Sequence, residues 1–149
     1  YRMAERIAVM GSGEISGIQD KKDLFERPNS VAAARLTGCE NISLVKADAK
    51  GNYVAEDWGI TVRPPQGQSC RYAALKSEDI KVFVENPKCG NDFIKVRPEM
   101  VIEDMNGLII RFKSLAGRMM TARIEERREA VNNEIYIEIP HEKIMFFDR

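Results

Sequence analysis

The stretch that decides the fold is residues 100–139, MVIEDMNGLIIRFKSLAGRMMTARIEERREAVNNEIYIEI. It contains three short runs, residues 109–113, 119–125 and 135–139, in which every second residue is apolar. This period of two is typical of strands with one buried face and one face in water. Turn residues precede the runs at 106–107, 116–117 and 132–133. The stretch predicts an antiparallel meander whose inward residues are Ile110, Phe112, Met120, Ala122, Ile124, Ile135, Ile137 and Ile139.

Composition narrows the classes of protein to which the chain can belong. The 149 residues are 44% hydrophobic, which is enough for one modest core. Lys plus Arg and Asp plus Glu number 23 each, so no overall charge steers the chain to nucleic acid or anionic lipid. Three separated cysteines and one histidine predict reduced thiols in a cytoplasmic protein and no zinc site. The chain has no apolar run near 18 residues, and its start at Tyr1 suggests a fragment of a longer protein.

The N-terminal quarter predicts a hairpin followed by two short helices. Residues 6–18 contain two apolar runs around Gly11-Ser12-Gly13, a turn that lacks the spacing of a phosphate-binding loop. Asp20 is placed to cap a helix that ends before Pro28, because proline excludes the residue before it from helical geometry. Ser30 is placed to cap a second helix, VAAARLTG, which ends at Gly38.

Residues 39–80 change from helical to strand patterns, so we place a domain boundary after residue 38. NISLVKAD (41–48) predicts a strand, residues 51–52 a turn, and YVAEDWGITV (53–62) a pair of strands. The Pro64-Pro65-Gln66-Gly67 segment is expected to interrupt the sheet. The only tryptophan, Trp58, is interpreted as an anchor of the core, with ligand stacking as the alternative.

The first 42 residues, YRMAERIAVMGSGEISGIQDKKDLFERPNSVAAARLTGCENI, resemble the end of the nucleotide-binding domain of an ABC-transporter ATPase subunit. LFERP (24–28) and LTGCEN (36–41) match two consecutive motifs that follow the hairpin in that family. ALKSEDI (74–80) and IYIEIPHEKIMFFD (135–148) resemble the accessory β-barrel that follows the domain in many importers. GCENIS (38–43) with Asp57-Trp58-Gly59 is most similar to the molybdate and sulfate branch.

The resemblance implies a mainly β fold, in which a hairpin and two short helices precede a small antiparallel OB-like (TOBE/MOP-like) barrel. Residues 1–38 would be a remnant of the nucleotide-binding domain, and residues 39–149 the accessory regulatory domain. The ATPase motifs would lie before Tyr1, so we expect this fragment to be no enzyme and to hold no cofactor, whereas an intact parent would use ATP and Mg²⁺. It would lie in the cytoplasm at the inner face of the membrane, beside a permease and a second ATPase subunit.

Family precedent also implies that the β domain can bind the transported oxyanion. Such a site needs several N–H or hydroxyl donors and one or two cations, because the anion loses its water. Groups of this kind occur near predicted turns at Lys76, Ser77, Lys113, Ser114 and Arg118. His141 lacks a partner for catalysis and is expected at the surface, and Glu103 and Asp104 are adjacent on a strand, which excludes an acid–base pair.

Two further expectations concern partners. The hairpin's apolar residues Ile7, Val9 and Met10 and its strand edges would lack the sheet of the parent domain, which predicts a homodimer with this segment exchanged. The alternative function is an OB-fold module that binds single-stranded nucleic acid through exposed aromatic residues. Balanced charge and few aromatic residues on the predicted wetted faces, chiefly Tyr136 and Phe83, argue against nucleic acid.

Overall fold

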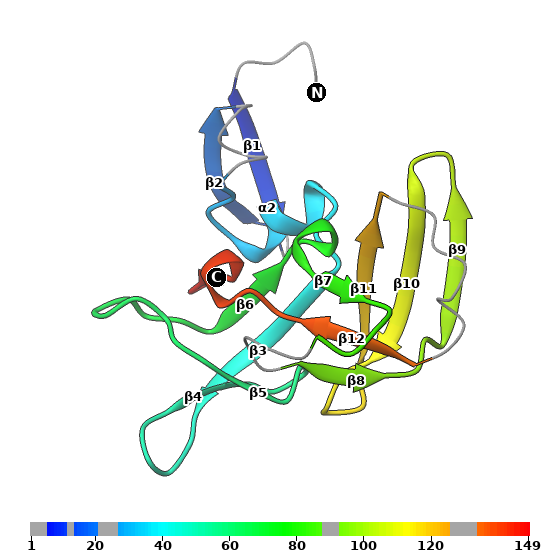
Figure 1. Ribbon diagram of the computed structural model, residues 1–149. Coiled ribbons are helices and arrows are strands. Elements are labelled where there is room, and N and C mark those ends of the chain that lie inside the picture. Colours follow the sequence, from blue (N-terminus) through cyan, green and yellow to red (C-terminus); the bar gives the residue numbers. More distant parts are fainter. Residues whose placement is uncertain (1–5, 12–13, 21–26, 88–92, 126–133) are drawn as a thin grey trace.

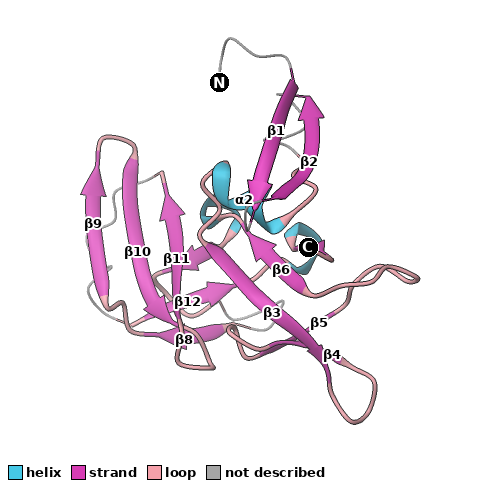
Figure 2. Ribbon diagram, turned by 180° about the vertical axis from the view of Figure 1, so that it is seen from behind, coloured by secondary structure: helices cyan, strands magenta, loops and turns pink. Residues whose placement is uncertain are grey.

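The computed structural model describes residues 6–11, 14–20, 27–87, 93–125 and 134–149. It is mainly β with antiparallel sheets, which confirms the predicted fold class. Figure 1 shows the strands in sequence colours, and Figure 2 shows from behind how few helical residues accompany them. The described strands are short, three to seven residues each. Residues from several of the sheets share one hydrophobic core.

The hairpin is confirmed. β1 (Arg6–Gly11) and β2 (Glu14–Asp20) pair antiparallel, with a change of register between Val9 and Met10. In Figure 1 this hairpin projects away from the other strands. The helix predicted after Asp20, including its cap, falls mainly on residues 21–26 and lies outside the described residues.

The second predicted helix is confirmed as α2 (Val31–Leu36). The Ala33 N–H donates to the Ser30 hydroxyl oxygen over 3.1 Å, which satisfies one of the backbone donors left unpaired at the start of a helix. Gly38 follows the helix with φ 92°, in the left-handed region that glycine adopts without strain. One buried side of α2 contacts β6 and β13 through the cluster Val31, Ala34, Cys39, Ala74 and Phe147.

The largest sheet confirms the strand predictions for residues 41–62. Its five strands run in the order β13-β6-β3-β4-β5. A turn with Gly51 at φ 82° joins β3 to β4, and a loop with Gly67 at φ 75° separates β5 from β6. The strands are β3 (Asn41–Ala47), β4 (Tyr53–Ala55), β5 (Ile60–Val62), β6 (Tyr72–Leu75) and β13 (Met145–Phe147).

The first two strands of the predicted meander are confirmed. β9 (Met100–Asp104), β10 (Gly107–Lys113) and β11 (Met119–Ile124) form an antiparallel sheet in the order β11-β10-β9. Ile110, Phe112, Met120 and Ala122 are at most 2% exposed, as the alternation predicted. Phe112 is opposite Met120 in the register, so both side chains extend from the same buried face.

The third strand of the meander was predicted wrongly. β12 (Ile135–Glu138) pairs with β7 (Lys81–Phe83) and β8 (Ile94–Val96), not with β11. Alternation shows which face of a strand is buried but carries no information about its neighbour. Ile135 and Ile137 are still fully buried, and they face the same core as the other inward residues. The two remaining elements are the 3₁₀ turns η1 (Ser77–Asp79) and η2 (His141–Lys143).

A buried amide joins two of the sheets. The Asn41 amide nitrogen on β3 donates to the Leu75 carbonyl oxygen (3.1 Å) and to the Thr121 carbonyl oxygen (2.7 Å). Its side-chain oxygen accepts from the Thr121 N–H at 2.7 Å, so Asn41 pairs with β11 as a strand would. Asn41 is 3% exposed, and burial makes these bonds costly to lose.

Candidate functional site

Two turns contact each other beside the core. The residues after β4 include Asp57, Trp58 and Gly59, and the β10–β11 connection includes Ser114. The Ser114 hydroxyl donates to the Asp57 carbonyl oxygen over 2.6 Å, and its oxygen accepts from the N–H groups of Ala116 and Arg118. Trp58 is 2% exposed between these turns and the sheets, which confirms its interpretation as a core anchor.

The structure brings together three of the five residues predicted to bind an oxyanion. Lys113, Ser114 and Arg118 lie at the β10–β11 turn, and each cation faces a carboxylate. The Arg118 Nε is 3.8 Å from an Asp57 carboxylate oxygen, and the Lys113 Nζ is 3.8 Å from a Glu99 carboxylate oxygen. Lys76 and Ser77 lie elsewhere: Lys76 follows β6, and Ser77 is the first residue of η1. Because Asp57 and Glu99 already neutralise the turn and Ser114 already bonds the backbone, an anion there would have to displace these contacts. The oxyanion site stays a prediction.

Two other interpretations made from sequence concern titratable side chains. His141 is exposed at the start of η2, as expected. Asp104 pairs with Arg123 through a 3.1 Å contact between Oδ2 and Nη1, on the sheet that contains β9 and β11. This ion pair holds the Asp104 carboxylate beside the Arg123 guanidinium.

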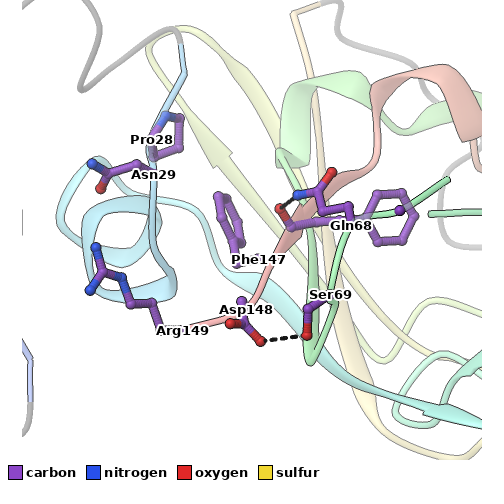
Figure 3. A pocket seen from close by; sticks show the side chains of 9 residues that line it. Pro28, Asn29, Gln68, Ser69, Phe147, Asp148 and Arg149 are labelled. Carbon is purple, nitrogen blue, oxygen red and sulfur yellow. Dashed lines mark hydrogen bonds between the residues drawn. The ribbon is translucent and has the colours of Figure 1, made fainter. Parts of the chain in front are cut away.

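A first cavity of about 670 Å³ lies at the β13 end of the five-stranded sheet (Figure 3). The Ser69 hydroxyl donates to the Asp148 carboxylate over 3.0 Å, and the Gln68 amide donates weakly to the Phe146 carbonyl oxygen over 3.4 Å. Figure 3 shows Pro28 and Asn29 on the opposite side from Gln68 and Ser69. The cavity combines few ionic groups with polar groups that already bond within the chain; its lining residues are Pro28, Asn29, Gly67, Gln68, Ser69, Phe146, Phe147, Asp148 and Arg149.

A second cavity, of about 890 Å³, was missed by sequence reasoning. Four separate segments contribute to it: β5 with the residues after it, β8 with the residue before it, the β10–β11 turn, and the residues after β12. Because these segments are far apart in sequence, no local motif could have indicated the cavity. Its lining residues are Ile60, Thr61, Arg63, Phe93, Ile94, Lys95, Leu115, Ile139 and His141.

The described cysteines are thiols in apolar surroundings. Burial raises the pKa values of both Cys39 and Cys70, because a buried thiolate would lose hydration. Backbone hydrogen bonds lower both pKa values but do not cancel this effect. Cys89 lies outside the described residues. In the part of the chain that the structure describes, no three His, Cys, Asp or Glu side chains cluster closely enough to hold a metal ion.

Two curated proteins are similar to this chain over most of its length. It is 23% identical over 151 residues to the sulfoquinovosyl glycerol transport ATP-binding protein of Agrobacterium fabrum, covering 98% of this chain and 42% of that protein. It is 29% identical over 129 residues to the molybdate/tungstate import ATP-binding protein of Pyrococcus horikoshii, covering 80% of this chain and 34% of that protein. Both proteins that it resembles are ATP-binding subunits of ABC importers. No protein-family model matches it.

The match agrees with the family resemblance drawn from residues 1–42 and 135–148, and is consistent with the C-terminal part of an importer ATPase subunit. The chain spans less than half the length of either importer subunit. The two relatives are named for different solutes, sulfoquinovosyl glycerol and molybdate/tungstate. Among the described residues, no helix has the length and apolarity needed to cross a membrane.

Proposed function

We propose that this chain is the C-terminal regulatory and dimer-forming region of the ATP-binding subunit of an ABC importer for molybdate, sulfate or a related oxyanion. The observation that carries the proposal is the match over 98% of the chain to a transport ATP-binding protein. In this role the chain supplies contacts and regulation, and the parent subunit supplies ATP hydrolysis with ATP and Mg²⁺. The parent would work in the cytoplasm, at the inner face of the membrane, with a permease and a second ATPase subunit.

Two surfaces support the dimer. The hairpin β1–β2 is a two-stranded sheet, so among the described strands its outer edges have no neighbour. A two-stranded sheet alone is marginally stable, and unpaired edges are templates for another chain. Exchange of this hairpin between two copies would give each edge a partner.

The second surface is the outer face of the three-stranded sheet, which we define by Met100, Ile102, Ile109 and Met119. Ile102 is opposite Ile109 in the register, so the two side chains extend from the same side of the sheet. Met100, Ile102 and Met119 are 40 to 51% exposed. β9 is also an edge strand among the described strands, so this apolar face lies beside unpaired backbone groups.

Sedimentation equilibrium at several protein concentrations tests the dimer. We expect the unmodified chain to dimerise and Val9→Lys to weaken dimerisation if the hairpin is exchanged, because a charged side chain blocks edge pairing. Ile102→Lys weakens it instead if the outer face forms the contact. Leu44→Lys, which places the same charge at a 43% exposed strand residue elsewhere, is the matched control. A monomer at all concentrations, or a dimer unaffected by both substitutions, would refute this part of the proposal.

The solute is tested separately, by thermal unfolding with molybdate, tungstate, sulfate or phosphate at fixed ionic strength. A ligand at about 100 times its Kd stabilises the folded state by roughly 2.7 kcal/mol. A shift with molybdate and tungstate alone, lost in Lys113→Gln, supports an oxyanion site at the β10–β11 turn. Thermal unfolding curves that coincide for all four anions would refute oxyanion sensing and leave the dimer contact as the proposed role.

A further inference from the structure

The second cavity has one sign of charge at its rim. Among the described residues that line it, Arg63, Lys95 and His141 are basic and none is acidic. Lys plus Arg and Asp plus Glu are equal in number in the whole sequence, so the excess of basic side chains at this cavity does not follow from the overall composition. A concave surface lined by one sign of charge concentrates ions of the other sign.

The three basic side chains differ in their carboxylate partners. Lys95 contacts the Glu134 carboxylate at 2.9 Å, and this pair raises the pKa of Lys95 and lowers that of Glu134. Within the described ranges, neither Arg63 nor His141 forms a salt bridge with a carboxylate. Arg63 therefore presents a planar guanidinium that can donate two parallel hydrogen bonds to an oxyanion group.

The remaining lining residues are mostly apolar. Phe93 supplies an aromatic ring, which packs edge-on against Phe83 with a 5.4 Å separation of ring centroids. That contact leaves the ring held in place at the cavity, where a bound apolar group can stack on it. Leu115 lies at the β10–β11 turn with 65% of its surface exposed, so a ligand beside it would remove apolar area from water.

We propose that this cavity binds a small organic anion that carries a carboxylate, phosphate or sulfonate group on an apolar or aromatic body. The acidic group lies beside Arg63 and His141, and the apolar body contacts Phe93 and Leu115. The cavity's volume of about 890 Å³ falls in the range of small-molecule sites. The proposal does not depend on the importer role, because it rests on the cavity alone.

The charge and the apolar lining together select this class of ligand. An inorganic anion would contact the guanidinium but leave Phe93 and Leu115 in water. A neutral apolar compound would cover the lining but gain nothing from the basic rim. A molecule with an acidic group and an apolar body gains both the contact with the guanidinium and the burial of apolar area. Its affinity should therefore exceed that of an inorganic anion or of a neutral apolar compound.

Fluorescence titration with 8-anilinonaphthalene-1-sulfonate, a sulfonate on an aromatic body, tests the proposal with the complete chain. Saturable binding should be displaced by benzoate, benzenesulfonate or phenyl phosphate, and the strongest competitor identifies the preferred acidic group. Inorganic phosphate and benzyl alcohol, which each supply one half of the ligand, should compete at least about tenfold less well. Near-ultraviolet circular dichroism of each protein confirms that the probe reports on the folded state.

Two variants and one control locate the binding site. Arg63→Gln should raise the Kd of the probe about tenfold or more, because a charge-assisted hydrogen bond is lost. Leu115→Ser should weaken the probe and leave competition by inorganic phosphate unchanged. Arg71→Gln removes an exposed arginine that does not line the cavity and should bind as the unmodified chain does. Equal Kd values for Arg63→Gln and the unmodified chain, or equal competition by inorganic phosphate and phenyl phosphate, would overturn the proposal. Neither result bears on dimerisation, so the proposed function can stand or fall separately.

Discussion

Replacing Asn41 by alanine should destabilise the chain more than its small change in volume suggests. The substitution removes three buried hydrogen bonds, which the Asn41 amide makes to Leu75 and to both backbone groups of Thr121. Each bond contributes about 1 kcal/mol, and a buried polar group left without a partner costs about 1–3 kcal/mol. We therefore expect a loss of about 3–5 kcal/mol in the free energy of unfolding, a large part of the total for a domain of this size.

Urea denaturation followed by circular dichroism measures this loss, and thermal unfolding should show a midpoint lowered by roughly 10 °C. Asn52→Ala, at an exposed residue of the β3–β4 turn, is the matched control and should change stability by less than about 0.5 kcal/mol. A loss below about 1 kcal/mol in Asn41→Ala would show that the amide does not hold the two sheets together.

Asn41→Asp separates hydrogen bonding from packing. The aspartate would face the two carbonyl oxygens to which the amide nitrogen now donates, so it needs a proton to bond either one. Its pKa should therefore be higher in the folded state than in the unfolded state. The stability deficit of Asn41→Asp relative to the unmodified chain should be smallest below the ordinary aspartate pKa and should grow as pH rises through the folded pKa. A deficit independent of pH would refute the assigned contacts.

Three smaller perturbations test other parts of the fold. Gly59→Ala should cost about 1–3 kcal/mol, because φ is +71° and the added Cβ would lie 2.9 Å from the Ala116 nitrogen; Gly51→Ala, at φ +82° with open space around it, should cost less. Ser30→Ala removes the cap of α2 and should lower the free energy of unfolding by about 1 kcal/mol in urea. Cys39 has a raised pKa in the folded state, so its thiol contributes stability below its ordinary value of 9.0 and loses it as pH rises through the folded value. At alkaline pH, the free energy of unfolding should therefore decrease more steeply with rising pH for the unmodified chain than for Cys39→Ala.

Each of these has a result that contradicts it. Equal losses in Gly59→Ala and Gly51→Ala would show that the two turns can separate at no cost. An unchanged midpoint in Ser30→Ala would show that α2 depends on its packing alone. Parallel pH curves for Cys39→Ala and the unmodified chain would mean that the thiol titrates alike in both states.

Local sequence patterns predicted much of the fold because their physical causes are local. Ser30 and Gly38 set the ends of α2 through hydrogen bonding and backbone geometry within one helical turn. Alternation in β10 and β11 predicted the burial of Phe112 and Met120, because successive strand side chains extend to opposite faces. The resemblance in residues 1–42 predicted the similarity to importer subunits, since long ordered motifs carry more information than any single residue.

The candidate site was less predictable. Lys113, Ser114 and Arg118 were expected together because they belong to one turn, but their partners Asp57 and Glu99 come from other parts of the chain. Sequence separation also hid the basic rim of the second cavity, whose residues Arg63 and His141 are distant in the chain. Contacts between segments that are distant in sequence can be identified only from the tertiary structure.

The sequence by itself determined the buried face of β10 and β11, the presence of α2 and of the β1–β2 hairpin, and the similarity to importer ATP-binding subunits. Only the tertiary structure decided that β12 pairs with β7 and β8, that Asn41 joins two sheets, and that an apolar cavity has a basic rim. The physical reason is the range of the interactions. Side-chain alternation and capping act between near neighbours in sequence, whereas strand partners and cavities depend on which distant surfaces pack most favourably.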